Sequence, residues 1–151
     1  MIDVREEILA RLFVIVGTIP NIRTAARNNI DALEDRLPAV VVMDGDEETG
    51  DVVDLSMHPS NKPIAVQMVP EIVIAEESDN VGTDITTLRR ELIKRVLFDT
   101  ELNEQIVKTG RHGNGAIRYL GCQTDLGWMR SLHGALLVRI MFKYFLKPND
   151  L

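Results

Sequence analysis

The alternation of apolar and other residues along positions 132–147 constrains the fold more than any other feature of the sequence. A period of two places successive side chains on opposite faces of an extended chain, so this stretch predicts a β-strand. One face of that strand is expected to hold Leu132, Leu136, Val138, Ile140, Phe142, Tyr144 and Leu146. A strand of this length spans about 50 Å at about 3.3 Å per residue, which is longer than a compact domain of this size needs. We therefore expect one end of the strand to contact a partner.

Length and composition indicate one domain, residues 1–151, of ordinary globular type. Apolar residues make up 45% of the chain and charged residues 26%. The net charge of −6 argues against a protein whose main role is to grip nucleic acid phosphates, because such binding needs clustered positive charge. The single cysteine, Cys122, fits a reducing compartment, and no stretch approaches the roughly 20 apolar residues that span a bilayer. We therefore expect synthesis in the cytoplasm and no membrane association.

Helices are expected where apolar residues recur at helical spacing or where a capping residue precedes such a segment. They are predicted at residues 2–16 with a stop at Gly17, at residues 81–97, and from Asp99–Thr100 to near Gly110. Further strands are predicted at residues 39–43 with an end at Asp44–Gly45, at 52–57 as the return strand of a hairpin, at 64–76 and at 117–124. Pro70 lies inside the third of these strands and indicates an edge strand or a bulge, because proline donates no ladder hydrogen bond. Residues 21–36 show no assignable pattern.

These elements predict an α/β (α+β) protein with a mixed, largely antiparallel sheet. The long C-terminal strand belongs to this sheet, which is expected to pack against two or three helices. The helix at 81–97 is expected to pack on the last strand, with Leu88, Leu92 and Val96 facing Val138, Ile140 and Phe142.

The segment Asp44–Asp51 is the only obvious candidate for a metal site, because clustered carboxylates suit hard cations. It does not fit a calcium loop, since the sixth position after this start is Thr49 and the twelfth is Leu55. It also departs from the Asp-x-Asp-x-Thr nucleophile motif of haloacid dehalogenases, because Glu48 occupies the threonine position. We interpret the segment as a solvated hairpin tip. No catalytic, metal or cofactor residues are predicted, and a small metal-dependent hydrolase using Asp44, Asp46 and Glu47 stays open as an alternative.

The order of segments and several phrases resemble a known family of structural proteins. These phrases are Val4–Leu12, Leu37–Glu47, Met68–Ile72, the helix at Leu88–Leu97, Gly115–Asp125 and Phe142–Pro148. Over nearly its whole length the chain resembles the tail terminator, or tail-completion, proteins of long-tailed bacteriophages, prophages and gene transfer agents.

The resemblance implies a virion structural protein that is not an enzyme and has no cofactor. Such a subunit would form a homo-oligomeric ring, a hexamer, at the head-proximal end of the tail after assembly in the bacterial cytoplasm. The ring would cap the tail tube, bind the tail tube protein, end its polymerisation and present a surface to the head–tail connector, while DNA passes through the lumen without sequence-specific binding. The alternative is a head-completion or neck adaptor protein of the same head–tail joint.

The candidate subunit interface lies on the second face of the last strand, which mixes basic with apolar residues. It consists of Arg139, Lys143, Lys147, Leu137, Met141 and Phe145. Its acidic counterpart is sought in Asp44, Asp46, Glu47 and Glu48 and in the segment Glu71–Asp79 of a neighbouring copy. A basic patch that meets an acidic one elsewhere on the molecule gives a head-to-tail contact, which can close into a ring. The alternative is that helices of the same subunit cover the apolar members of this face.

Overall fold

The computed structural model describes residues 3–50, 52–59, 61–78, 80–125 and 133–148. In this part of the chain a five-stranded sheet has the spatial order β1-β2-β3-β5-β4. The strands are β1 (Thr24–Arg27), β2 (Ala39–Thr49), β3 (Ile64–Glu77), β4 (Ile117–Asp125) and β5 (His133–Leu146). β1 is parallel to β2 and every other pairing is antiparallel. The predicted α+β class, with a mixed sheet and a long C-terminal strand, is confirmed.

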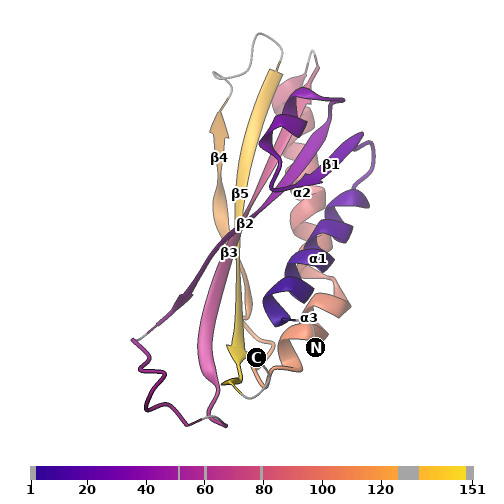
Figure 1. The fold of residues 1–151 in the computed structure, drawn as a ribbon. Coiled ribbons are helices and arrows are strands. Elements are labelled where there is room, and N and C mark those ends of the chain that lie inside the picture. Colours follow the sequence, from indigo (N-terminus) through magenta and orange to yellow (C-terminus); the bar gives the residue numbers. More distant parts are fainter. Residues whose placement is uncertain (1–2, 51, 60, 79, 126–132, 149–151) are drawn as a thin grey trace.

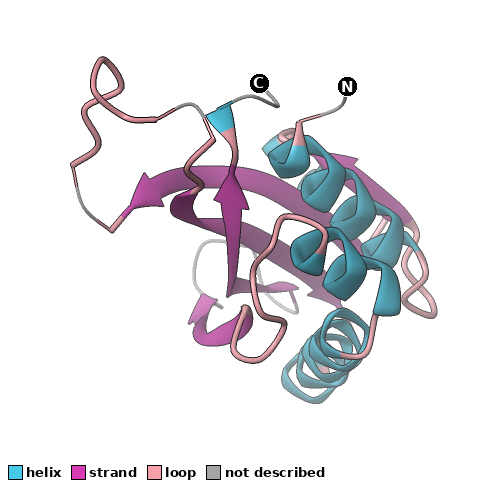
Figure 2. Cartoon of the chain, turned by 90° about the horizontal axis from the view of Figure 1, so that it is seen from below, coloured by secondary structure: helices cyan, strands magenta, loops and turns pink. Residues whose placement is uncertain are grey.

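The α-helices α1 (Val4–Gly17), α2 (Val81–Leu97) and α3 (Thr100–Val107) lie on the same face of the sheet (Figures 1 and 2). Two of them begin at an aspartate cap, as the sequence indicates for α3. The side chain of Asp3 accepts a hydrogen bond from the Arg5 N–H, and that of Asp99 accepts one from the Leu102 N–H. Among the described residues no helix is long and apolar enough to cross a membrane.

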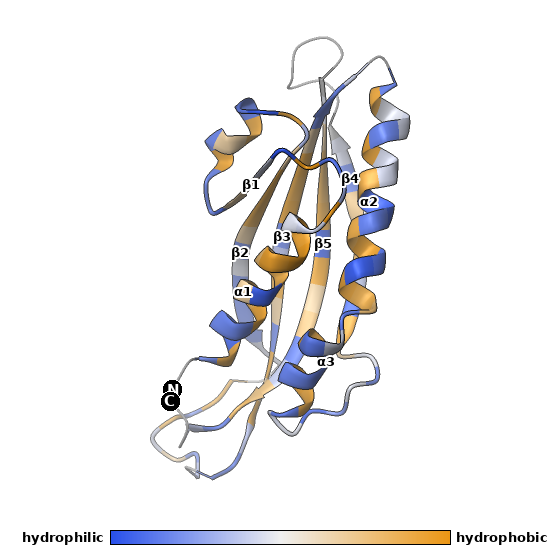
Figure 3. Ribbon diagram, turned by 90° about the vertical axis from the view of Figure 1, so that its right-hand side faces the viewer, coloured by the Kyte–Doolittle hydropathy of each residue, from blue (hydrophilic) through white to orange (hydrophobic). Residues whose placement is uncertain are grey.

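The main core lies between the helices and the sheet. In Figure 3 the central strands are largely hydrophobic, whereas the helices carry hydrophilic residues on their outer sides. Leu88, Leu92 and Val96 of α2 are buried in one cluster with Val138 and Phe142 of β5. α2 contacts both β3 and β5, which confirms the predicted packing of this helix on the last strand.

The length of β5 has an internal explanation. β3 is equally long, and the two strands pair from Ile64 opposite Leu146 to Glu77 opposite His133. The expectation that β5 is longer than its own domain needs is therefore wrong, because the backbone of β5 is paired with β3 along its whole described length. Leu132 lies outside the described residues.

As far as Thr49 the acidic segment is strand and not a hairpin tip, which corrects two predictions, while Asp51 lies outside the described residues. β2 continues to Thr49 through a bulge between Met43 and Asp46, and its return strand is β3. Gly45 makes the bulge possible because its φ is +72°, a value that other residues rarely adopt. Residues 52–57, predicted as the return strand, lie in a loop that joins the ends of β2 and β3.

Pro70 lies in the central strand of the sheet, so the edge-strand alternative is wrong. The bulge stands on the neighbouring strand, since the β2 ladder passes from Met43 opposite Glu71 to Asp46 opposite Val69. Pro70 therefore faces an interrupted part of the ladder, where a missing N–H is tolerated.

The second face of the sheet is covered at one end by the unassigned segment 21–36. This segment forms β1 and the short 3₁₀ helix η1 (Ile30–Glu34). Ala32 and Leu33 of η1 pack on Val41 of β2 and Val73 of β3 in a second, smaller core. η1 thus closes one end of this face, and no α-helix of the described part of the chain lies over the remainder (Figure 1).

Candidate assembly surface

The strand register places charged residues in an ordered pattern on the sheet face that is turned away from the helices. We call eight exposed or half-exposed residues of this face, on β2, β3 and β5, the outer sheet face: Asp46, Glu48, Gln67, Val69, Glu71, Arg139, Met141 and Lys143. Glu48 is opposite Gln67, which is opposite Lys143, and Asp46 is opposite Val69. The two carboxylates on β2 and the two cations on β5 are therefore separated by β3, which contributes Gln67, Val69 and a third carboxylate, Glu71.

Of the basic and apolar candidates on β5, the structure leaves Arg139, Met141 and Lys143 on the outer sheet face. Arg139 is half exposed and forms a loose ion pair with Glu71 on the neighbouring strand, with 3.9 Å between its Nε and the Glu71 Oε2. An exposed pair at this distance contributes little to folding, so both groups stay accessible to a partner. The sequence predicts Glu71 in the acidic counterpart on a neighbouring copy, whereas the structure pairs it with Arg139 of its own subunit.

The remaining three β5 candidates lie in other surroundings. Leu137 packs against the core under η1, so its own chain covers it, although the covering element is not an α-helix. Phe145 is half-buried next to the α3–β4 connector, where its backbone N–H donates to the Thr109 hydroxyl at 3.1 Å. Lys147 is exposed beyond the end of β5.

The four acidic candidates on β2 do not act together, because successive strand residues point to opposite faces. Asp44 lies on the helix side, where Arg27 donates to both of its oxygens at 2.7 and 3.1 Å. Arg27 also donates to both oxygens of Glu6 in α1, and its hydrogen bonds, together with its charge, lower the pKa of both carboxyls. Asp44 is thus occupied within its own subunit and is not available to a neighbour.

Glu47 is also bound on the helix side. The buried hydroxyl of Tyr144 donates a hydrogen bond to its Oε1. Burial, together with this carboxylate, raises the pKa of Tyr144 well above its usual range. Asp46 and Glu48 are exposed on the opposite face. The segment therefore does not converge on one point, and among the described residues no group of three His, Cys, Asp or Glu side chains could hold a metal ion.

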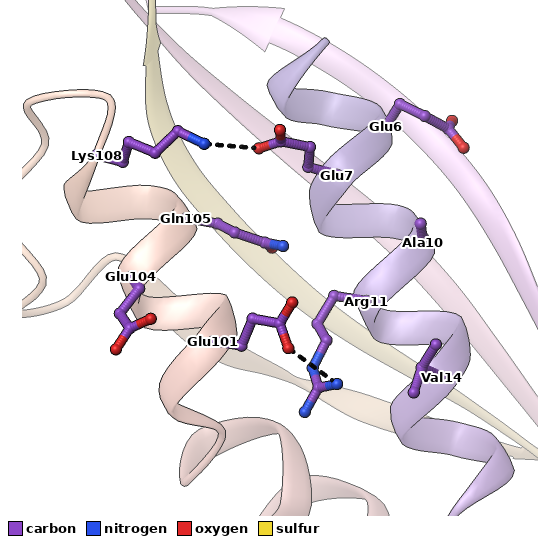
Figure 4. A pocket seen from close by; sticks show the side chains of 9 residues that line it. All are labelled: Glu6, Glu7, Ala10, Arg11, Val14, Glu101, Glu104, Gln105 and Lys108. Atoms are coloured by element: carbon purple, nitrogen blue, oxygen red, sulfur yellow. Dashed lines mark ion pairs between the residues drawn. The ribbon is translucent and has the colours of Figure 1, made fainter. Parts of the chain in front are cut away.

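A second surface, which the sequence did not reveal, is a groove of about 610 Å³ between α1 and α3 (Figure 4). It is lined by Glu6, Glu7, Ala10, Arg11, Val14, Glu101, Glu104, Gln105 and Lys108. Four carboxylates and two cations line it, and Arg27 from outside the groove binds one of these carboxylates, Glu6, so a small acidic excess remains. No local sequence motif predicts this groove, because its acidic residues belong to two helices that are separated by most of the chain.

Ion pairs account for part of the charge in this α1–α3 groove. Arg11 pairs with Glu101 at 3.0 Å, and Lys108 with Glu7 at 3.5 Å (Figure 4). The side-chain oxygen Oε1 of Gln105 is buried without a hydrogen-bond partner. The acceptors that the groove offers to a basic side chain of another molecule are the exposed carboxylates of Glu101 and Glu104.

The outer sheet face and the α1–α3 groove lie on opposite sides of the molecule, because the helices cover only one face of the sheet (Figures 1 and 2). Unlike surfaces on opposite sides favour head-to-tail association over a two-fold symmetric dimer. No protein-family model matches this sequence, and no curated protein matches it significantly.

Proposed function

We propose that this chain is a structural subunit of a virion tail, a tail terminator that assembles head to tail into a ring at the head-proximal end. The ring would cap the tail tube, end its polymerisation and present a surface to the head–tail connector. One observation supports the head-to-tail assembly. Arg139, Met141 and Lys143 lie on the outer sheet face, and the acidic α1–α3 groove lies on the opposite side of the same subunit. The tail assignment itself rests on the resemblance in sequence.

The size and charge of the chain are compatible with this role. A domain of 151 residues has a radius of gyration of roughly 15 Å and a width of about 38 Å. Six such bodies in a closed ring surround an opening of about the same width, which admits duplex DNA. The net charge of −6 limits adhesion of DNA to the wall, because like charges repel.

Charge reversal on the outer sheet face tests the head-to-tail contact. We expect the double variant Arg139→Glu, Lys143→Glu to show a lower oligomeric mass than the wild type in light scattering, because both groups would face carboxylates of the neighbour. The matched control is Arg36→Glu, Arg90→Glu, which makes the same change of charge at exposed positions that are not among the eight residues of the outer sheet face. Equal masses for the two double variants would contradict the proposed contact.

A binding experiment separates the tail terminator from the neck adaptor. The tail terminator should bind the end of a tail tube and stop its growth, whereas a neck adaptor should bind the connector or portal alone. Tube length measured by electron microscopy, with and without this protein, distinguishes the two. Unchanged tube length together with connector binding would replace the proposal by the neck adaptor.

A further inference from the structure

The loop at residues 52–59 exposes more apolar surface than a loop that meets only water would. Val52 is 100% exposed, Leu55 73% and Met57 81%. By contrast, Val53 packs against the main core and fixes the start of the loop. In Figure 1 the loop projects from the end of the sheet on the side away from the helices. Three large apolar side chains on one projecting segment are typical of a contact with another molecule.

The loop also carries a defined negative charge. Asp54 accepts hydrogen bonds from the backbone N–H of Ser56 at 3.0 Å and from its hydroxyl at 2.6 Å. These bonds lower the pKa of the fully exposed Asp54 carboxyl and hold it at the turn between the apolar residues. A surface that receives this loop therefore needs an apolar floor and a cation near its rim.

The helical side of the molecule offers a surface with both properties. A groove of about 470 Å³ lies between α1 and the C-terminal part of α2. Its apolar part includes Val14, which is 51% exposed, and Phe98, which is 78% exposed. Lys94 and Arg95 of α2 line the same groove. Arg95 is held near Glu91 and Thr18, while Lys94 is exposed.

One copy cannot bring these two surfaces together. Figures 1 and 2 both show the loop on the far side of the sheet from α1 and α2. In a head-to-tail row the loop side of one subunit faces the helical side of the next, and such a contact is heterologous. The apolar loop then covers Phe98 and Val14, and Asp54 comes near the cations of α2.

We infer that loop 52–59 of one subunit seats in the α1–α2 groove of a second copy of this chain, with Leu55 and Met57 against Phe98 and Val14. This inference rests on the proposed head-to-tail assembly and adds the contact that holds neighbours together. Burial of exposed apolar side chains supplies the affinity, and the Asp54–Lys94 attraction fixes the direction of the loop.

Cysteine cross-linking between two different variants tests the contact directly. Both carry Cys122→Ser, which removes the exposed native thiol. One also carries Leu55→Cys and the other Phe98→Cys. On mixing under mild oxidation we expect a disulfide-linked dimer that neither variant forms alone, because each contact needs one loop and one groove. The control pairs the Leu55→Cys variant with Leu120→Cys, an exposed position on β4 that lies outside the groove.

A second variant measures the same contact without cross-linking. Leu55→Asp with Met57→Asp should lower the oligomeric mass and leave the thermal unfolding midpoint of the subunit unchanged, because both side chains are exposed. An oligomer of wild-type mass that gives no Leu55–Phe98 disulfide would overturn this contact and leave the ring proposal standing. A wild-type protein that is monomeric at every concentration would overturn both.

Discussion

The bulge at Gly45 gives the sharpest test of how the sequence specifies this sheet, and we expect Gly45→Ala to destabilise the protein severely. Two separate effects operate at this position. The φ of +72° strains any residue with a Cβ, which costs about 1–3 kcal/mol. The added Cβ would also lie 2.1 Å from the carbonyl oxygen of Val69, so the backbones of β2 and β3 would have to move apart. Loss of more than about 3 kcal/mol is expected from the two together.

Two other glycines separate these effects. Gly121 has a φ of +120°, but nothing lies within 4 Å of an added Cβ, so Gly121→Ala should cost only the backbone strain of about 1–3 kcal/mol. Gly17 ends α1 with open space around it and no positive φ, so Gly17→Ala should be neutral or stabilise by up to about 1 kcal/mol. Urea unfolding followed by circular dichroism measures all three. A Gly45→Ala variant no less stable than Gly121→Ala would refute the proposed clash with Val69.

Three further predictions concern the core, the acid limb of stability and metal binding. Leu92→Ala should lower the free energy of unfolding by about 2–5 kcal/mol because Leu92 is fully buried, whereas Leu97→Ala, at an exposed position, should lower it much less. A loss below about 1 kcal/mol for Leu92→Ala would contradict the place of Leu92 in the core. Arg27→Met should lower the free energy of unfolding by about 1–3 kcal/mol at pH 7, after allowance for the partial exposure of the ion pair. Arg27 lowers the pKa of Asp44, so the stabilisation from this pair is lost as the Asp44 carboxyl is protonated. In urea unfolding the difference between the variant and the wild type should therefore shrink below about pH 4. Calorimetric titration of the whole protein with calcium, magnesium and manganese should show no binding tighter than millimolar. Micromolar binding at residues 44–51 would contradict the finding that the carboxylates of β2 point to two opposite faces of the sheet.

The sequence was most informative where one local period controls the structure. The spacing of Ile85, Leu88, Leu92 and Val96 predicts α2, and all four side chains are buried. The alternation along β5 predicts the buried face from Leu136 to Tyr144. In both cases the apolar period and the secondary structure depend on neighbouring residues alone, so no tertiary information is needed.

Predictions were wrong where tertiary contacts override local preference. Asp44, Gly45 and Asp46 look like a turn, yet β3 supplies a partner strand that carries β2 onward through a bulge. Pro70 indicates an edge strand or a bulge; the edge alternative is wrong, and the bulge is present but lies on β2, where it accommodates Pro70 in the central strand. β1 has no alternation to reveal it, because none of its four residues is fully buried.

The candidate surface could be predicted only in part, for the same reason. The positions of Arg139, Met141 and Lys143 follow from strand alternation, so the sequence places them together. The accessibility of each carboxylate depends on ion pairs between residues that are distant in the sequence, such as Arg27 with Asp44. Such pairs cannot be predicted from the sequence alone. The α1–α3 groove forms only when two distant helices pack side by side.

Head-to-tail ring assembly is the central claim, and the mass and shape of the purified protein test it most directly. Light scattering combined with negative-stain electron microscopy should show closed rings with a central opening and a mass of about six subunits of 17.0 kDa. The interaction should weaken in high salt to the extent that exposed charges contribute, because they are screened beyond roughly 8 Å at physiological ionic strength. A protein that stays monomeric at every concentration and salt, or that forms only two-fold symmetric dimers, would contradict the account.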